Sequence, residues 1–344
     1  MAQKNEAAVL FLALLITLGL VGGVYFWLAG NSNVKFVSTT TNSSQQSPQP
    51  NEETLAQVQN VPSGLFRYGG STTWAPIRKE VDSAIKTVLP KFQLSYTDPI
   101  SRAPGSGTGI KMLLDNQLAF AQSSRALEPE EYQIAQQKGF TLKEIPVAID
   151  GIAIAVHPNL NISSLTIQQI KKIYTGKITN WQEVGGRNLA IKAYSRRLED
   201  GGTIEFFHQN VLDKENFGSQ VQFTPTTTTA LRQVATNEGS IYYASAPEIV
   251  PQCTVKTIAI GRKPGEAVVP YKEPLVPRNQ CPQKVNQLNQ EAFKSGQYPI
   301  TRRLFVIVKQ NGQIDQQAGE AYVRLLLTNQ GQELISKSGF VRIQ

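Results

Sequence analysis

Residues 145–156 read IPVAIDGIAIAV, and this stretch decides the fold class. It is apolar almost throughout, with Asp150 as its one charged residue. A nearly continuous apolar strand is typical of a sheet that is covered on both faces by helices. The stretch therefore predicts a buried strand in a protein that combines strands with helices.

Strands and helices alternate on both sides of this strand. The apolar patterns predict strands at 65–68, from Phe92, at 118–122, 189–194, from Gly239 and at 301–308, and helices at 74–89, from Ile110, at 166–174, 204–212 and 318–327. Such alternation favours an α/β architecture with mainly parallel sheets.

The first 63 residues differ in composition from the rest of the chain. Residues 7–29 are uncharged and mostly apolar, and a helix of that length crosses a hydrocarbon core of about 30 Å. A cleavable signal peptide has a shorter apolar region, of about 7–15 residues. We expect a transmembrane signal anchor at 7–29, a cytoplasmic tip at 1–6 and a flexible Ser-, Thr-, Gln- and Pro-rich tether at 30–63. A signal peptide that is removed is the alternative.

The two cysteines, Cys253 and Cys281, agree with an extracytoplasmic location. Disulfides persist outside the cytosol, so we expect this pair to be bridged and the globular part to lie outside the plasma (inner) membrane. Two unpaired thiols are the alternative. There is no CxxC pattern, and His157 and His208 are too few for an ordinary histidine-based metal site. We expect neither a metal nor a cofactor.

The charge of the chain points to an anionic partner. Lys and Arg number 34 against 26 Asp and Glu, a net charge of +8, and the residues after Pro62 carry +9 because residues 1–62 carry −1. The cations form no runs, and aromatic residues make up only 8% of the chain. Nucleic-acid binding is therefore not expected, because a protein that follows a phosphate backbone needs clustered cations.

Three stretches place small hydroxyl and glycine residues between a predicted strand and a helix. They are Gly70–Thr73 (GSTT), Gly105–Gly109 (GSGTG) and Gly201–Thr203 (GGT). Each would present backbone N–H groups at a helix N-terminus together with a hydroxyl, which suits a tetrahedral oxyanion. One such stretch alone is usually a helix cap. Three of them at strand ends favour a shared binding site, because ligands of open α/β sheets gather there.

Enzymatic and nucleotide-binding patterns are absent. GSGTG is followed by Ile110 where a dinucleotide-binding loop needs glycine, and no GxxxxGK[ST] occurs. There is no GxSxG, and two histidines give no convincing Ser-His-Asp arrangement. We expect a binding protein rather than an enzyme.

Arginines follow two of the predicted strands. Arg196 and Arg197 end the segment IKAYSRR just before Glu199, and Arg125 stands in a similar place after FAQSS. A guanidinium in this position can bind an oxyanion through two N–H groups, with a nearby carboxylate to hold it. A solvated pair on a loop is the alternative for Arg196 and Arg197.

The order of these motifs resembles one family over residues 64–344. GGSTTWAPI, GSGTGIK, FAQSSRAL, IPVAIDGIAIAVHP, IKKIYTGKITNW, SRRLEDGGT, GSIYYASA and YPITRRLFVIV occur as they do in PstS-like phosphate-binding proteins of ABC transporters. The resemblance implies the two-lobed periplasmic-binding-protein fold, type II, with hinge strands and an anion between the lobes. Lobe 1 would be 64–147 and 298–344, and lobe 2 would be 148–297.

The resemblance also implies which residues bind phosphate. Thr72 and Thr73 match the first anion-binding turn, Ser106 matches the hydroxyl of the second, and Gly201, Gly202 and Thr203 match the third. Arg197 matches the anion-binding arginine, and Glu199 stands where an Asp usually orients it. Ser124 and Arg125 are also expected to bind phosphate and complete the predicted set.

Two departures from the family pattern bear on selectivity. Gly201 replaces a serine, and Ser124 stands where some members carry an aspartate that accepts the proton of phosphate. We expect Asp150 to supply that acceptor. A buried carboxylate would be satisfied by phosphate, which carries a proton at neutral pH, and would face an unpaired like charge with sulfate.

These features predict a membrane-tethered, monomeric, extracytoplasmic protein that captures inorganic phosphate for an ABC permease. Closure of the hinge would be its working motion. A binding protein for sulfate, molybdate or a phosphonate is one alternative. A phosphate sensor or scaffold that is not coupled to transport is another.

Overall fold

The computed structural model describes residues 53–100 and 102–343. These residues lie in one compact unit, Pro50–Gln344. The predicted tip at 1–6, the predicted membrane span at 7–29 and the tether up to residue 52 fall outside the described residues. Within the described ranges, no helix is both long and apolar enough to cross a membrane.

One mixed sheet runs through the unit in the order β2-β1-β3-β11-β4-β8-β6-β7, with β9 paired to β4. Its strands are β1 (Gly64–Gly70), β2 (Phe92–Tyr96), β3 (Phe120–Ser123), β4 (Thr141–Val156), β6 (Lys192–Ser195), β7 (Gln222–Phe223), β8 (Ser240–Ser245), β9 (Lys256–Thr257) and β11 (Thr301–Gln310). A separate pair joins β5 (Ser164–Thr166) to β10 (Ala259–Gly261).

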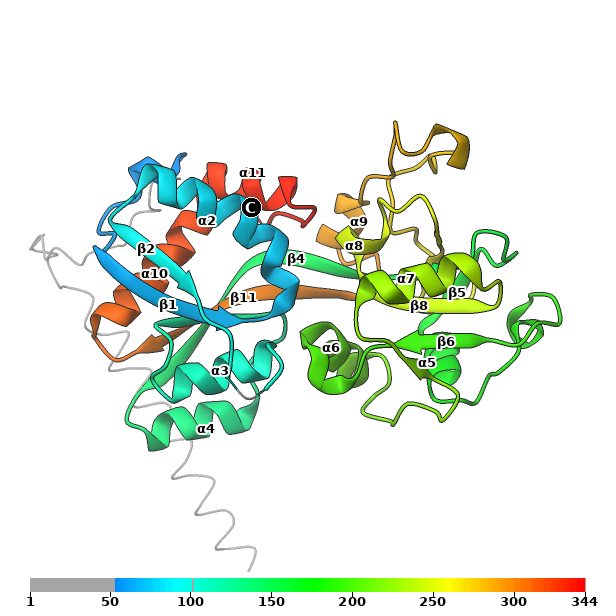
Figure 1. Ribbon diagram of the computed structural model, residues 1–344, viewed down its shortest axis with the longest axis horizontal. Coiled ribbons are helices and arrows are strands. Elements are labelled where there is room, and N and C mark those ends of the chain that lie inside the picture. Colours follow the sequence, from blue (N-terminus) through cyan, green and yellow to red (C-terminus); the bar gives the residue numbers. More distant parts are fainter. Residues whose placement is uncertain (1–52, 101, 344) are drawn as a thin grey trace, which may run out of the picture. The chain divides into compact units, whose positions relative to one another are not determined.

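Two long strands, β4 and β11, connect two lobes (Figure 1). They run antiparallel, with Gln310 opposite Thr141 and Thr301 opposite Gly151. Along β4, Val147 and Ala148 belong to one hydrophobic core, whereas Ile152–Val156 belong to another. The chain thus leaves lobe 1 along β4 and returns along β11, so the expectation of mainly parallel sheets is corrected to a mixed sheet. Parallel pairing is kept inside the lobes, between β1 and its neighbours β2 and β3 and between β6 and its neighbours β7 and β8.

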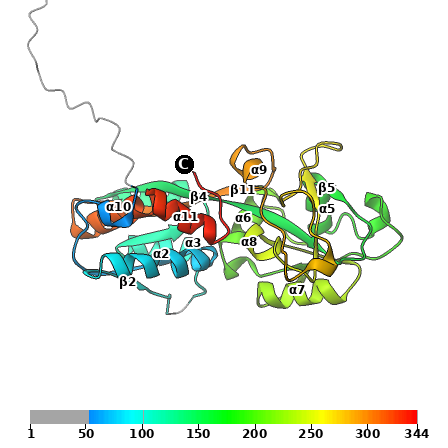
Figure 2. The ribbon, with the colours of Figure 1, turned by 90° about the horizontal axis from the view of Figure 1, so that it is seen from above.

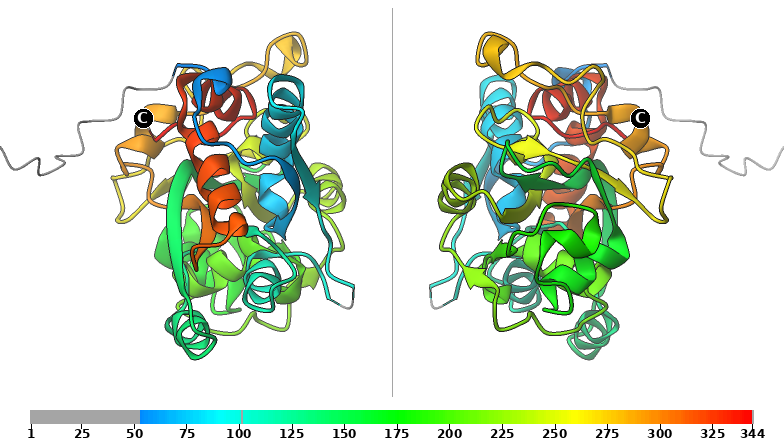
Figure 3. Two further views of the ribbon diagram at one scale, coloured as in Figure 1. Left: turned by 90° about the vertical axis from the view of Figure 1, so that its left-hand side faces the viewer. Right: turned by 90° about the vertical axis from the view of Figure 1, so that its right-hand side faces the viewer.

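Helices cover both faces of the lobe 1 strands. Phe120 of β3 packs with α2 (Ala75–Val88) and α10 (Ile314–Leu327), and the next residue, Ala121, packs with α3 (Ser106–Leu114). This alternation is the two-residue period of a strand that is buried on both faces. Figure 1 shows α2 and α11 (Asn329–Lys337) above these strands, and α3 and α4 (Pro129–Gln137) below them. The end-on views of Figure 3 show that lobe 1 combines the blue and cyan N-terminal segments with the red C-terminal helices.

Lobe 2 packs around β8. Its residue Tyr243 stacks on Phe207 of α6 (Gly202–Asn210) and meets Tyr174 of α5 (Ile167–Tyr174) edge to face. The adjacent Tyr242 faces the other way, where its hydroxyl lies 3.3 Å from that of Thr227 on α7 (Thr227–Thr236). Figure 2 shows α5 and α7 on opposite sides of the lobe 2 strands.

The remaining elements are α8 (Ala246–Ile249), α9 (Gln290–Lys294) and the 3-10 turns η1 (Leu55–Gln57), η2 (Thr72–Trp74), η3 (Trp181–Val184), η4 (Leu198–Asp200) and η5 (Arg278–Gln280).

Several predicted boundaries are corrected. The predicted tether ends too late, because Leu55 and Val58 are buried in the lobe 1 core and Leu55 N donates to Gln330 Oε1 at 3.0 Å. Helix α3 begins at Ser106 rather than Ile110, and α10 begins at Ile314 rather than Ala318. Helix α4 is not predicted by the apolar pattern of the sequence.

The predicted disulfide is confirmed. Cys253 and Cys281 are bridged, with their Cα atoms 5.8 Å apart, and no free cysteine remains. The disulfide closes a loop between residues 253 and 281, within the long segment that follows α8 in lobe 2.

Candidate anion-binding site

The first predicted turn, which follows β1, is held from behind by its neighbours. Ser71 N donates to Gln122 O of β3 at 2.8 Å. Arg78 of α2 donates through Nη1 to Ser71 O at 3.1 Å and to Gln122 Oε1 at 3.0 Å. Because the backbone of residue 71 is fixed on both sides, Thr72 and Thr73 emerge in a defined direction towards lobe 2.

The second and third turns meet across the boundary between the lobes. Ser106 and Ser124 are fully buried in lobe 1, with their hydroxyl oxygens 3.1 Å apart, and Ser71 Oγ donates to Ser124 Oγ at 2.9 Å. Gly202 of lobe 2 approaches so closely that a Cβ atom there would lie 2.6 Å from Ser106 Oγ and still nearer to Ser124 Oγ. Gly201 has φ +143°, a conformation that side chains disfavour. Glycine at both positions therefore permits this approach.

Two threonine hydroxyls complete the junction. Thr73 Oγ1 of lobe 1 lies 3.2 Å from Thr203 Oγ1 of lobe 2. Arg302, on the hinge strand β11, donates from Nη2 to both, at 3.1 Å and 2.8 Å, and from Nη1 to Gly202 O at 2.9 Å. One buried guanidinium thus contacts both lobes.

Asp150 is the counterion of this arginine. Its Oδ2 accepts from Arg302 Nε at 3.0 Å and Nη2 at 2.8 Å, and its Oδ1 accepts from Ser245 Oγ at 2.6 Å. Both partners of the ion pair are buried, with side-chain exposures of 1% for Arg302 and 0% for Asp150. Burial raises the pKa of Asp150, against the opposing effects of Arg302 and Ser245. Because arginine cannot be deprotonated here, the guanidinium holds Asp150 in its charged form.

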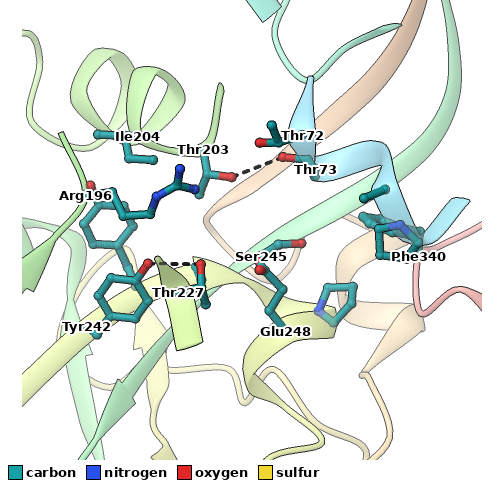
Figure 4. Close-up of a pocket in the computed structure, with 15 residues that line it drawn as sticks. Thr72, Thr73, Arg196, Thr203, Ile204, Thr227, Tyr242, Ser245, Glu248 and Phe340 are labelled. Atoms are coloured by element: carbon teal, nitrogen blue, oxygen red, sulfur yellow. Dashed lines mark hydrogen bonds between the residues drawn. The ribbon is translucent and has the colours of Figure 1, made fainter. Parts of the chain in front are cut away.

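A cavity of about 220 Å³ opens beside this junction (Figure 4). Lobe 1 supplies Thr72 and Thr73. The polar residues from lobe 2 are Arg196, Thr203, Thr227, Tyr242, Ser245 and Glu248. Ala75, Pro76, Pro247 and Phe340 add apolar wall. The cavity therefore combines hydroxyl groups, one arginine and one carboxylate.

Arg196 is the arginine that lines the cavity. Its Nη2 donates to Asp200 O at 2.7 Å, and its buried Nε has no hydrogen-bond partner among the described residues. Arg197 is exposed and lines a different hollow with Asp200, Phe223, Thr224 and Pro225. The structure therefore directs the residue next to the predicted one into the cavity. A buried N–H without a partner is costly, so this Nε is a ready donor for an anion.

Glu248 is the carboxylate on the cavity wall. Burial raises its pKa, as does the negative charge of Asp150, whereas Arg196 and Arg302 act in the opposite direction. A hydrogen bond with Thr227 also acts to lower the pKa of Glu248.

Arg125 lies away from the cavity and forms a second connection between the lobes. It pairs with Glu131 at 2.8 Å within lobe 1 and, through Nε, with Glu205 of α6 at 3.3 Å in lobe 2. Glu199 lines the same surface hollow as Arg125 and Glu205. The predicted roles of Arg125 as an anion ligand and of Glu199 as a support for Arg197 stay predictions.

The predicted residues thus fall into three groups. Thr72, Thr73 and Thr203 line the cavity, whereas Ser106, Ser124, Gly201, Gly202 and Asp150 lie at the adjoining junction. Arg125, Arg197 and Glu199 lie outside both. No local sequence pattern marks Ser245, Glu248, Thr227 or Arg302 as site residues, although Ser245 lies in GSIYYASA and Arg302 in YPITRRLFVIV. In the described ranges, no group of His, Cys, Asp or Glu is placed to hold a metal ion.

Two α/β lobes that share two hinge strands are typical of a two-lobed binding protein, and the hydroxyl-lined cavity between them, with its unpartnered arginine N–H, suits a small anion. A model of the PBP superfamily domain matches residues 37–330, and the chain belongs to this superfamily. The resemblance to PstS-like proteins is confirmed by named relatives and by solved structures.

The relatives are similar along most of their length. The phosphate-binding protein PstS of Staphylococcus haemolyticus is 26% identical over 78% of this chain and 78% of its own. PstS of Staphylococcus aureus strain USA300 is 26% identical over 81% and 78%.

Solved structures share the fold. A protein of Clostridium perfringens, assigned as a phosphate ABC transporter substrate-binding protein and solved with bound phosphate, has a TM-score of 0.64 at 25% identity and covers 82% of this chain and 100% of its own. An ABC-type phosphate transport receptor of Vibrio cholerae has a TM-score of 0.62 at 19% identity, over 80% and 99%. At that identity, the second likeness concerns the fold alone.

Proposed function

We propose that this protein captures inorganic phosphate between its two lobes and delivers it to an ABC-type phosphate permease. The observation that carries the proposal is the cavity in which Thr72, Thr73 and Thr203 offer hydroxyls beside the unpartnered Nε of Arg196. Charge-assisted hydrogen bonds from an arginine, together with hydroxyls of a pre-formed site, suit a phosphate oxyanion. The relatives named for phosphate binding support the same ligand.

The turns at the junction are proposed to join the site when the lobes open to admit the ligand and then close on it. In the present arrangement, Ser106 and Ser124 bond to each other and lie against Gly202. A small opening of the hinge would expose these hydroxyls and the N-terminus of α6 to the anion. Thr72, Thr73, Ser106, Ser124, Gly201, Gly202 and Thr203 then surround it.

We also propose that the protein works outside the plasma membrane, tethered by the apolar segment 7–29. The disulfide between Cys253 and Cys281 supports an oxidising compartment. A tether raises the local concentration of the binding protein near a permease in the same membrane. A binding protein in this role changes no covalent bond of its ligand.

Isothermal titration of the full-length protein tests the ligand. We expect phosphate to bind at about micromolar Kd or tighter, a free energy of roughly −8 kcal/mol or better. Titrations with sulfate, molybdate and methylphosphonate run beside it. Binding of one of these anions in preference to phosphate would contradict the proposal.

The transport step needs a separate test. We expect permease subunits to co-purify with the tethered protein, and phosphate uptake to fall when its gene is deleted. Tight phosphate binding with unchanged uptake would instead favour a sensor.

A further inference from the structure

The hydroxyl of Ser245, at the end of β8, has its single hydrogen directed away from the ligand cavity. Ser245 Oγ donates to Asp150 Oδ1 at 2.6 Å. Asp150 cannot return a proton, because Arg302 donates to its other oxygen at 2.8 Å and 3.0 Å and keeps the carboxylate charged. The direction of the Ser245–Asp150 hydrogen bond is therefore fixed by the buried ion pair behind it.

This fixed direction decides what Ser245 offers to a ligand. A serine hydroxyl has one hydrogen and two acceptor lone pairs. Ser245 also lines the cavity, and Figure 4 shows it between Thr73 and Glu248. With its hydrogen committed to Asp150, Ser245 presents only an acceptor to the cavity. Asp150 itself is not among the lining residues.

A hydrogen-bond acceptor in the cavity distinguishes oxyanions that carry an O–H group from those that carry none. Phosphate and arsenate carry at least one O–H at neutral pH, whereas sulfate and selenate carry none. A protonated anion can donate to Ser245, but a fully ionised one brings an oxygen lone pair against the lone pairs of Ser245. A buried polar contact of that kind is unfavourable for the anion without a proton.

We propose that Ser245 is the residue that selects a protonated oxyanion, with Asp150 and Arg302 as the positioning residues that set its hydroxyl. The inference rests on the proposed function and adds its ligand class. It also gives Asp150 an indirect part in proton recognition, through Ser245, in place of direct contact with the ligand.

Glu248 is the competing acceptor, because its carboxylate lines the same cavity. The charged groups that influence it are Asp150, Arg196 and Arg302. The geometry favours Ser245, because the bond to Asp150 commits its only hydrogen, so that it faces the cavity as an acceptor alone. Glu248→Gln therefore belongs in the test.

The experiment is a titration of the full-length protein and its variants with phosphate, arsenate, sulfate and selenate. We expect the wild type to bind the first two and to discriminate against the last two. In Ser245→Ala, phosphate and arsenate should weaken by about tenfold or more while sulfate and selenate do not, so the preference falls by that factor.

Asp150→Asn reverses the polarity of the same hydroxyl. Arg302 can donate only to the amide oxygen of the new side chain. The amide NH₂ therefore faces Ser245 and donates to its oxygen, and the serine hydrogen turns towards the cavity. We expect this variant to gain affinity for sulfate relative to phosphate. Circular dichroism checks that it folds. If it does not fold, the ratio measured for Ser245→Ala decides.

Thr72→Val is the matched control, because it removes a cavity hydroxyl that has no hydrogen bond to Asp150 or Glu248 among the described residues. It should change the four affinities by similar factors. An unchanged phosphate-to-sulfate ratio in Ser245→Ala, or its loss in Glu248→Gln alone, would overturn the inference. A wild type that binds none of the four anions would instead overturn the proposed function.

Discussion

At the scale of the single residue, substitutions of Arg196 and of its neighbour Arg197 are expected to differ in their effect on phosphate affinity. Arg196 lines the cavity with an unpartnered Nε, whereas Arg197 is exposed outside it. We expect Arg196→Gln to weaken phosphate binding by roughly ten- to a hundredfold, since a hydrogen bond to a charged group contributes about 1.5–3 kcal/mol. Arg197→Gln is the matched control and should bind almost as the wild type. Titration measures both, and a larger loss in Arg197→Gln would reverse the assignment.

The types of residue at the site can be predicted from the sequence. The sequence does not show which side chains face the cavity or how their hydrogen bonds are directed. Thr72, Thr73 and Thr203 follow from a local pattern, because hydroxyls beside glycines mark strand-to-helix turns. The choice between Arg196 and Arg197 depends on where β6 ends and η4 begins. The polarity of Ser245 depends on Asp150 and Arg302, which are 152 residues apart in sequence. Contacts between residues so far apart in the chain produce no local sequence pattern.

At the scale of the element, helix α2 is tied to the sheet through a buried carboxyl. Asp82 of α2 accepts from Tyr68 of β1, and from Tyr322 of α10 at 2.9 Å. Burial raises the pKa of Asp82 to about 6, against the opposing effect of the two tyrosine hydrogen bonds. In the unfolded chain the pKa is about 3.9, so between these values the folded state binds more protons and stability falls as pH rises.

Denaturation of the wild type and Asp82→Asn at pH 4 to 7 tests this sign. The stability of the wild type relative to the variant should fall over this range, by about 2–3 kcal/mol at most. Asp115→Asn is the control with the opposite sign. Hydrogen bonds from Lys138 and Lys111 lower the pKa of Asp115, so its contribution should be lost as pH falls. Parallel pH profiles for the wild type and Asp82→Asn would contradict the prediction.

The elements themselves were largely predictable where apolar periodicity is strong. Helix α2 and strands β4 and β11 lie close to their predicted positions because each buries a regular apolar pattern. The beginning of α10 was missed because Ile314 and its neighbours are polar or exposed and pack little. The burial of Leu55 and Val58 on lobe 1 cannot be predicted from the sequence, because two apolar residues in a polar segment give no periodicity.

At the scale of the whole molecule, the two lobes meet through contacts that the ligand must accommodate. Arg302 joins the hinge to Thr73 and Thr203, and Arg125 reaches Glu205. The two-lobed class follows from the resemblance of many motifs, whereas these contacts required the structure. A ligand that shifts the lobes must therefore compete with, or replace, hydrogen bonds that already exist between them.

Gly202 is where closure of the two lobes leaves least room, and Gly202→Ala tests whether binding depends on that closure. An added Cβ would lie 2.6 Å from Ser106 Oγ across the lobe boundary. Alanine is favourable at the first residue of α6, and a small opening of the hinge makes room for its methyl group in the free protein, so the free energy of unfolding should change little. We expect phosphate affinity to fall by about tenfold or more, as a clash costs on the order of 1–3 kcal/mol.

Small-angle scattering measures whether the lobes close. The radius of gyration of the wild type should decrease with phosphate, and that of Gly202→Ala should decrease less. Gly105→Ala is the matched control, because its Cβ would also face lobe 2 but at an ordinary 3.5 Å from Gly201 Cα. It should bind and close like the wild type. Full affinity in Gly202→Ala, with a decrease in the radius of gyration equal to that of the wild type, would contradict the prediction, because a closed complex should leave no room for that methyl group.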